Sequence, residues 1–432
     1  MNAEEIKSIE ALLRREVVPA MGCTEPVAVS LCAAKAAELL GGVPEKVIVS
    51  LSANVIKNAM GVGIPGTGGM IGLPVAVALG VLGGKSEYGL EVLKDIDQDV
   101  VDRATALVDN GIIEIRHEES IDRKLYIKAD CFSGEDSASA VIADQHANFV
   151  YLSQGKEILL DRLRNEEEEL SDELMLNMRK VYDFAVEAPL GQIEFILDSV
   201  TFNKAVAECS MEGNYGHGLG ALLKGPAGRW MLKDGIYRKI LAYTSAACDA
   251  RMSGISMTVM SNSGSGNQGI VATLPVAVFA EGNGNSREEL IRALTFSHLM
   301  VVYIKQSLGR LSGLCGCVVA ASGSACGLVY LMGGNYEQAC YAVKNMIANL
   351  TGMICDGAKP SCSLKVTSAV SMAGLSAMLA MESRCVQAVE GIIEEDVDES
   401  IKNMTLLGSV GMAETDKLIL HIMTHKKAGK QS

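Results

Sequence analysis

The chain has 432 residues, and its hydrophobic content of 49% suffices for a large core spread over two or three domains or lobes. A formal net charge of −14 excludes the basic field that phosphate groups need, so nucleic acid is not an expected partner. Glu4 and Glu5 stand where a secretory signal has its basic start and apolar run, so we expect a cytoplasmic protein.

The first part of the chain, residues 1–85, is predicted to be mainly helical. Apolar residues at helical spacing predict a helix over residues 3–17, which Pro19 ends. A second helix is predicted from Thr24 to the Gly41-Gly42 stop, and residues 47–51 are typical of a strand. We assign residues 1–85 to the N-terminal part of a helical catalytic core.

The character of the sequence changes over residues 86–164. Strands are predicted at residues 112–117, 125–131, 138–143 and 148–152, and we interpret this segment as a small α+β lobe. An acidic helix is predicted at residues 157–169, with the four glutamates 166–169 forming a solvated face.

Residues 165–432 are predicted to form the rest of the helical catalytic core and to carry its cysteines. A capping box from Ser286 to Glu289 predicts a helix that ends at Leu308, and further helices are predicted at residues 336–350 and 368–381. The expected fold is therefore α+β and predominantly α-helical.

Three uncharged stretches, residues 58–84, 252–280 and 311–336, are each long enough to cross a bilayer. Two of them contain Pro and several Gly, and none has an aromatic belt, so we interpret them as core and expect no membrane. The sequence Leu-Pro-Val-Ala-Val occurs at residues 73–77 and again at 274–278, which raises the hypothesis of an internal repeat.

Cysteine carries the most chemical information. In a chain of this length without a signal, 12 cysteines favour metal binding or catalysis over disulfides. Cys355 and Cys362 lie in a turn with Gly and Pro, and Cys315 lies in a second glycine-containing turn, where Cys317 competes with it as a ligand. Spacing alone leaves a disulfide or a zinc site open for the Cys355–Cys362 pair. Three thiolates would leave one iron of a 4Fe–4S cubane free to act as a Lewis acid.

Seven other cysteines have apolar or helical surroundings that are typical of packed side chains: Cys32, Cys131, Cys209, Cys248, Cys326, Cys340 and Cys385.

Cys23 differs because it comes just before the predicted helix at Thr24. The positive end of a helix favours a thiolate, which indicates a reactive thiol that acts as base or nucleophile, with a plain packed cysteine as the alternative. The polar loop 261–269 has backbone N–H groups and hydroxyls that suit a carboxylate, with a plain flexible connection as the alternative.

The histidines offer one candidate for catalysis. His217 is a candidate proton carrier, whereas His298 is expected in the core. The others are expected to be peripheral: His117, His146, His421 and His425.

Four motifs together resemble those of L-cysteine desulfidase. They are Met-Gly-Cys-Thr-Glu-Pro at residues 21–26, Ser-Asn-Ser-Gly-Ser-Gly-Asn-Gln-Gly at 261–269, Cys-Gly-Cys at 315–317 and Cys-Asp-Gly-Ala-Lys-Pro-Ser-Cys at 355–362. The sequence is also similar to the bacterial relatives of that enzyme and, more distantly, to the alpha chain of iron–sulfur L-serine dehydratase.

The resemblance implies a 4Fe–4S cluster held by Cys315, Cys355 and Cys362, and a catalytic thiol at Cys23. It implies a lyase that converts L-cysteine and water to pyruvate, ammonia and hydrogen sulfide. Thr24, Glu25, Ser261 and Asn262 are expected to bind the substrate, with Ser261 and Asn262 holding its carboxylate or amine. Some cluster enzymes of this kind carry a C-terminal cysteine that occupies the open iron, but residues 426–432 contain no cysteine.

Other functions remain open at this point. L-serine is an alternative substrate for the same chemistry, with hydroxide as leaving group. A pyridoxal-phosphate lyase needs a Schiff-base lysine, for which Lys57 and Lys365 have no persuasive context. A non-catalytic cluster-binding sensor is a further alternative. The expected partner is a small amino acid, and the sequence leaves homo-oligomerisation open.

Overall fold

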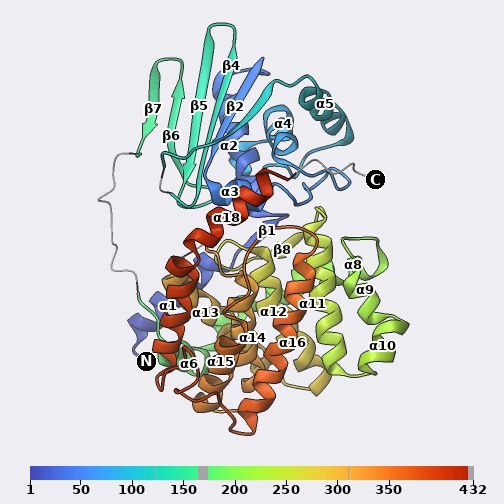
Figure 1. Cartoon of the computed structure of the whole chain (residues 1–432), viewed down its shortest axis with the longest axis vertical. Helices are drawn as coiled ribbons and strands as arrows, with labels where there is room; N and C mark the ends of the chain where they lie inside the picture. Colours follow the sequence, from blue (N-terminus) through green and yellow to red (C-terminus); the bar gives the residue numbers. More distant parts are fainter. Residues whose placement is uncertain (122, 164–173, 310, 427–432) are drawn as a thin grey trace.

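The computed structural model describes residues 1–121, 123–163, 174–309 and 311–426 of the chain, and these form two lobes (Figure 1). One lobe is built around a mixed sheet and the other is helical, so the fold is α+β and predominantly α-helical, as predicted. The predicted glutamate run at 166–169 and the end of the chain at 427–432 lie outside the described residues.

The sheet has the strand order β3-β2-β4-β5-β6-β7. Only β2 and β3 pair in parallel; the other neighbours are antiparallel, with Ala129 of β4 opposite Ala140 of β5. The strands are β2 (Lys46–Leu51), β3 (Ile113–His117), β4 (Tyr126–Ser133), β5 (Asp136–Ala143), β6 (Phe149–Gln154) and β7 (Glu157–Asp161).

The predicted acidic helix is wrong over its first residues, because they form β7. Glu157 pairs with Gln154 and Asp161 with Tyr151, so the segment adds an antiparallel edge strand to β6. The pairing partner lies outside the segment itself, and tertiary pairing of this kind overrides a local helical preference.

Helices cover one face of the sheet. Val47, Val49 and Leu51 of β2 alternate toward this face and are fully buried under α2 and α4. Because α2 lies between the sheet and α4, its surface is apolar on nearly all sides. The helix ends at Gly41, which adopts a left-handed conformation with a φ of 82°. This layer and its neighbours are α2 (Thr24–Leu40), α3 (Ala53–Ala59), α4 (Leu73–Gly83), the 3₁₀ helix η1 (Ser86–Glu91) and α5 (Gln98–Asp109).

The sheet and the core beneath it are built from residues on both sides of the domain boundary predicted at residue 85. β2, α2 and α4 all come from residues 1–85, which the sequence analysis assigned to the helical core. One further strand pair joins distant parts of the chain, since β1 (Pro19–Met21) pairs antiparallel with β8 (Thr258–Met260). Because the pair is antiparallel, Ser261 lies beside Val18, and a separate hydrogen bond from the Thr24 hydroxyl to the Gly264 carbonyl at 2.8 Å joins the start of α2 to the 261–269 loop.

The helical lobe packs around α12, α13 and α14 (Figure 1). The capping box at Ser286 and Glu289 is present with both hydrogen bonds and begins α13, as predicted. The elements of this lobe are α1 (Ala3–Glu16), α6 (Met178–Glu187), α7 (Leu190–Ile193), η2 (Glu194–Leu197), α8 (Asp198–Glu212), α9 (Leu219–Lys224), α10 (Pro226–Leu232), α11 (Ile236–Met252), α12 (Gly266–Asn283), α13 (Arg287–Leu308), α14 (Gly316–Leu331), α15 (Tyr336–Leu350), α16 (Cys362–Met381), α17 (Val397–Leu406), the π-helical turn η3 (Leu407–Gly411) and α18 (Ala413–Thr424).

Two helices of this lobe bear on the predictions. α16 begins at Cys362, six residues before the start predicted from the sequence, so a candidate ligand is the first residue of a helix. Within the described part of the chain, α16 alone is long and apolar enough to cross a membrane, yet it packs against α11, α14 and α15. α18 runs from the helical lobe to α3 beside the sheet, so the end of the chain ties the two lobes together (Figure 1).

Candidate functional site

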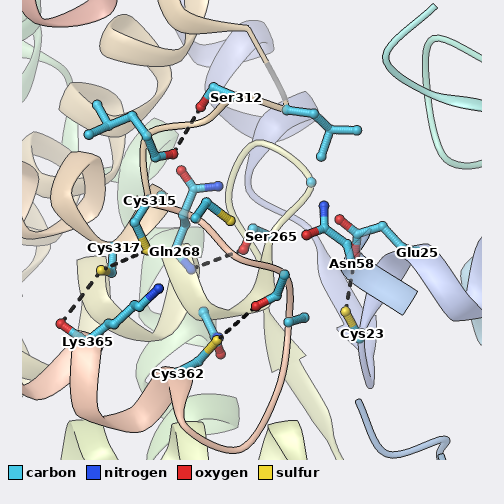
Figure 2. Close-up of a pocket in the computed structure, with 18 of the residues that line it drawn as sticks. Cys23, Glu25, Asn58, Ser265, Gln268, Ser312, Cys315, Cys317, Cys362 and Lys365 are labelled. Atoms are coloured by element: carbon cyan, nitrogen blue, oxygen red, sulfur yellow. Dashed lines mark hydrogen bonds between the residues drawn. The ribbon is translucent and has the colours of Figure 1, made fainter. Parts of the chain in front are cut away.

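A cavity of about 110 Å³ between the two lobes collects the candidate cysteines. Figure 2 shows Cys23, Glu25 and Asn58 on one side and Cys315, Cys317 and Cys362 on the other. The cysteines that line the cavity are Cys23, Cys315, Cys317, Cys355 and Cys362. The other seven cysteines of the chain do not line it, and all twelve are free thiols.

Two loops far apart in sequence are paired by their backbones, and this brings Cys315 next to Cys355. Leu314 and Ile354 form an isolated antiparallel bridge. The Cys315 N–H donates to the Met353 carbonyl at 2.9 Å, and the Cys355 N–H donates to the Gly313 carbonyl at 2.7 Å. Because each cysteine lies beside this bridge, the backbone positions both thiols at one end of the cavity.

Gly357 allows the second loop to turn back toward the cavity. Its φ is 89°, and a Cβ at this position would lie 2.2 Å from the Lys57 carbonyl oxygen. No other residue type fits there without movement of the backbone. The turn delivers Cys362 to the start of α16, where its Sγ lies 3.6 Å from the Gly357 carbonyl oxygen.

Two lysines brace the same loop through Asp356. Lys359 Nζ donates to the Gly357 carbonyl at 3.1 Å, and Lys365 Nζ donates to the Ile354 carbonyl at 2.8 Å. Both ammonium groups also form ion pairs with Asp356. Burial opposes the charged form of Asp356, but the hydrogen bonds from the lysines outweigh it and lower the pKa of this carboxyl to about 2. The loop that presents Cys355 is therefore held by a carboxylate that stays ionised at neutral pH.

The donor set fits an iron–sulfur cluster. Thiolate ligands suit iron–sulfur clusters, and each cluster cysteine binds a separate iron, so the ligands need not converge on one ion. Among the described residues, no three His, Cys, Asp or Glu side chains surround a single metal position. The Cys317 Sγ lies 3.2 Å from the Cys315 Sγ, so Cys317 stays the nearest competitor as a ligand.

Cys23 occupies the N-cap of α2 and is 2% exposed. Its thiol donates to Glu25 Oε2 at 3.2 Å. Burial and then the Glu25 carboxylate raise the pKa of the Cys23 thiol, while the charge of Arg251 acts in the opposite direction. The expectation that the helix end makes Cys23 a thiolate is therefore wrong for this environment, because desolvation and the neighbouring carboxylate outweigh the helix dipole.

The substrate-binding residues expected from the sequence divide into two groups. Glu25 lines the cavity, and the Thr24 hydroxyl lies behind it, 3.0 Å from Glu25 Oε2. Ser261 and Asn262 do not line the cavity. The Ser261 hydroxyl donates to the Val18 carbonyl at 2.7 Å, and the Asn262 amide donates to the His298 carbonyl at 3.0 Å. These two side chains hold the loop in place.

Four later residues of the same loop line the cavity instead, namely Gly264, Ser265, Asn267 and Gln268. Figure 2 shows Ser265 and Gln268 between the Cys23 side and the Cys315 side. The sequence analysis selected the right loop, but the side chains that face the cavity come from its second half.

Other lining residues were not selected from the sequence. His146, expected to be peripheral, is 6% exposed and reaches the cavity from the turn between β5 and β6. That expectation was wrong because the sheet lobe folds over the helical lobe. Asn58 and Arg251 also line the cavity, and Arg251 could have been noticed as a lone arginine in the small-residue segment 244–252.

Comparison with known proteins places these features in a family. The model of the family described as serine dehydratase alpha chain matches residues 87–421, which include the 261–269 loop and the cysteines at 315, 355 and 362. The chain belongs to the serine dehydratase alpha chain family. Cys23 precedes the matched residues, so the family match gives no evidence on the role of Cys23.

Three relatives can be aligned with almost the whole chain. A UPF0597 protein of Bacteroides fragilis is 61% identical over 427 residues, covering 99% of this chain and 100% of the relative. A UPF0597 protein of Porphyromonas gingivalis is 51% identical, with 99% and 100% covered. One of Shewanella pealeana is 42% identical, with 96% and 97% covered. The alignment with each of them therefore reaches the N-terminal segment that carries Cys23.

Proposed function

We propose that the chain is an iron–sulfur lyase that converts L-cysteine and water to pyruvate, ammonia and hydrogen sulfide. The observation that carries this proposal is the meeting of Cys23 with Cys315, Cys355 and Cys362 in one cavity. Membership of the serine dehydratase alpha chain family supports a lyase of this type. The free state of all twelve cysteines supports a reducing, cytoplasmic setting.

In this proposal Cys315, Cys355 and Cys362 hold a 4Fe–4S cluster, which supplies a Lewis-acidic iron with an open coordination position when bound. The protein's own contribution to that site is the bridged pair of loops and the lysine-braced Asp356, which fix the thiols before any ligand enters.

Cys23 is proposed as the base that removes the α-proton. Its thiol donates to Glu25 at 3.2 Å, so Glu25 is positioned to take the thiol proton. Because burial and Glu25 raise the pKa of the thiol, the thiolate needs stabilising positive charge, which Arg251 supplies from the same cavity. The thiolate then accepts the proton from the α-carbon, the freed electron pair forms the Cα–Cβ double bond, and the Cβ–S bond breaks with departure of sulfide. The aminoacrylate product tautomerises to an imine, and water hydrolyses it to pyruvate and ammonia.

L-serine is the second candidate substrate, and the family match specifically favours it. The same proton transfer applies, with hydroxide leaving from Cβ in place of sulfide. A pyridoxal-phosphate mechanism gains no support, because Lys57 is paired with Asp416 and Lys365 with Asp356.

The test is a comparison of kcat/KM for L-cysteine and L-serine on anaerobically purified protein, with matched variants of the N-cap cysteine and the interior cysteine of α2. Cys23→Ala should lower sulfide release by about 10²- to 10⁴-fold, the usual contribution of a general base. Cys32→Ala is the control, since Cys32 is buried against the sheet and does not line the cavity. A higher kcat/KM for L-serine would make the chain a serine dehydratase. Full activity of Cys23→Ala would refute the role of Cys23, and the absence of turnover with either amino acid would favour a non-catalytic sensor.

A further inference from the structure

Arg251 is a buried cation whose side chain makes no hydrogen bond or ion pair with any described residue. It ends α11, is 2% exposed and lines the cavity. Its Nε is fully buried and lacks an acceptor. Glu25 lines the same cavity, but its carboxylate accepts from Cys23 and Thr24 and forms no ion pair with Arg251 among the described residues. A buried guanidinium normally has an anionic partner, because an unpaired buried charge costs several kcal/mol.

The position of Arg251 increases this electrostatic cost. A Cβ on Gly266, the first residue of α12, would lie 2.2 Å from Arg251 Nε and 2.8 Å from its Cζ, so the guanidinium packs directly against the start of that helix. The N-terminal end of a helix carries partial positive charge and disfavours a neighbouring cation. An anion in the cavity would offset both the unpaired guanidinium and the helix end.

Two orphaned acceptors lie beside this unpaired donor. The Asn267 amide nitrogen donates to Met252 Sδ at 3.4 Å, and the Gln268 amide nitrogen donates to the Asn262 carbonyl at 3.5 Å. The nitrogen end of each amide is assigned from these contacts. The amide oxygens of both residues are buried and accept no hydrogen bond from the described residues. Since both residues line the cavity, the oxygens suit a ligand that brings N–H donors.

We propose that Arg251 binds the α-carboxylate, and Asn267 and Gln268 the α-ammonium group, of the amino-acid substrate. The proposal rests on the proposed function and defines its substrate class as free α-amino acids. A guanidinium matches a carboxylate in bidentate geometry, and the two amide oxygens match an ammonium group. The arrangement places the substrate head at the start of α12, between the Cys23 side and the Cys315 side of the cavity, and leaves Ser261 and Asn262 to anchor the loop.

The test measures equilibrium binding of L-alanine, which lacks a β-leaving group, by calorimetry on anaerobic, cluster-loaded full-length protein. Ethylamine and propionate serve as probes that lack the carboxylate and the ammonium group, respectively. Arg251→Met should weaken L-alanine binding by about 30-fold or more, the cost of removing one partner of a buried charge pair, and should leave ethylamine binding unchanged. Gln268→Met should weaken L-alanine but not propionate.

A second readout separates a binding role from a structural one. Removing an unpaired buried cation should leave the thermal midpoint of the ligand-free protein unchanged or raise it. The matched control is Arg238→Met on the same helix, because Arg238 donates to the Leu223 and Lys224 carbonyls and pairs with Asp234. That control should lower the midpoint and leave L-alanine affinity intact.

The outcomes distinguish this inference from the proposed reaction. L-alanine affinity that is unchanged in Arg251→Met, or a wild-type protein that binds no L-alanine, would overturn the inference even if L-cysteine is turned over. L-alanine binding that is lost in Arg251→Met would support the inference even if neither L-cysteine nor L-serine reacts, in which case the proposed reaction alone would fail.

Discussion

The buried ion pair between Lys57 and Asp416 gives the sharpest stability prediction, because it ties the C-terminal helix to the sheet lobe. Lys57 lies on α3 and Asp416 on α18, and their side chains are 2% and 17% exposed. The Lys57 carbonyl oxygen also packs against Gly357 of the cysteine loop. Loss of Asp416 therefore leaves an unpaired ammonium group buried next to the candidate site.

Asp416→Asn is expected to lower the free energy of unfolding by about 2–3 kcal/mol. Breaking a buried pair by removing one partner costs about 3–5 kcal/mol, and the partial exposure of Asp416 lets water recover part of that cost. The double variant Lys57→Met/Asp416→Leu should regain most of the loss, because an apolar pair of similar volume leaves no buried charge.

Urea denaturation followed by circular dichroism measures these differences. Glu399→Gln is the control, since Glu399 pairs with Lys402 at the surface and its loss should cost no more than about 0.5 kcal/mol. The reasoning is refuted if Asp416→Asn costs as little as this control, or if the double variant is no more stable than Asp416→Asn alone.

Three further predictions follow from particular contacts. Burial lowers the pKa of His298 in the folded chain to about 3 from its ordinary 6.5. Between these pH values the unfolded chain therefore binds a proton that the folded chain does not. The free energy of unfolding should fall by about 1.4 kcal/mol per pH unit as the pH drops from 6.5 toward 3. His298→Gln should reduce that slope in urea titrations at pH 7 and 5.5, and an unchanged slope would contradict the assignment. Gly357→Ala should cost more than about 2 kcal/mol and reduce bound iron, whereas Gly333→Ala, with φ of 82° and open space around it, should cost about 1 kcal/mol and keep the iron. Cys315→Ser should lose iron on anaerobic purification and Cys317→Ser should keep it; the reverse result would make Cys317 the ligand.

Elements with local signals could be predicted from the sequence. The Ser286 capping box begins α13, and left-handed Gly41 ends α2, because caps and glycine turns act within a few residues. β7 could not be predicted in this way, since its strand conformation depends on pairing with β6. The lobe boundary was equally inaccessible, because β2 joins β3 and β4 across more than sixty residues of chain.

The candidate site was predictable in its residue types and less so in its geometry. The cysteines and the 261–269 loop stood out by composition, but the bridge between Leu314 and Ile354 that pairs the two cysteine loops is a long-range contact without a local signal. The same holds for His146, which reaches the cavity from the sheet lobe, and for Arg251, whose significance lies in the absence of a partner among the described residues. The expected thiolate at Cys23 failed because burial cannot be read from the motif alone.

The central claim is that thiols from two paired loops hold one iron–sulfur cluster beside Cys23. Its most direct test is the iron and acid-labile sulfide content of wild-type protein, purified without oxygen and fully reconstituted. The account predicts about four of each per chain. Fewer than about three irons per chain would contradict it.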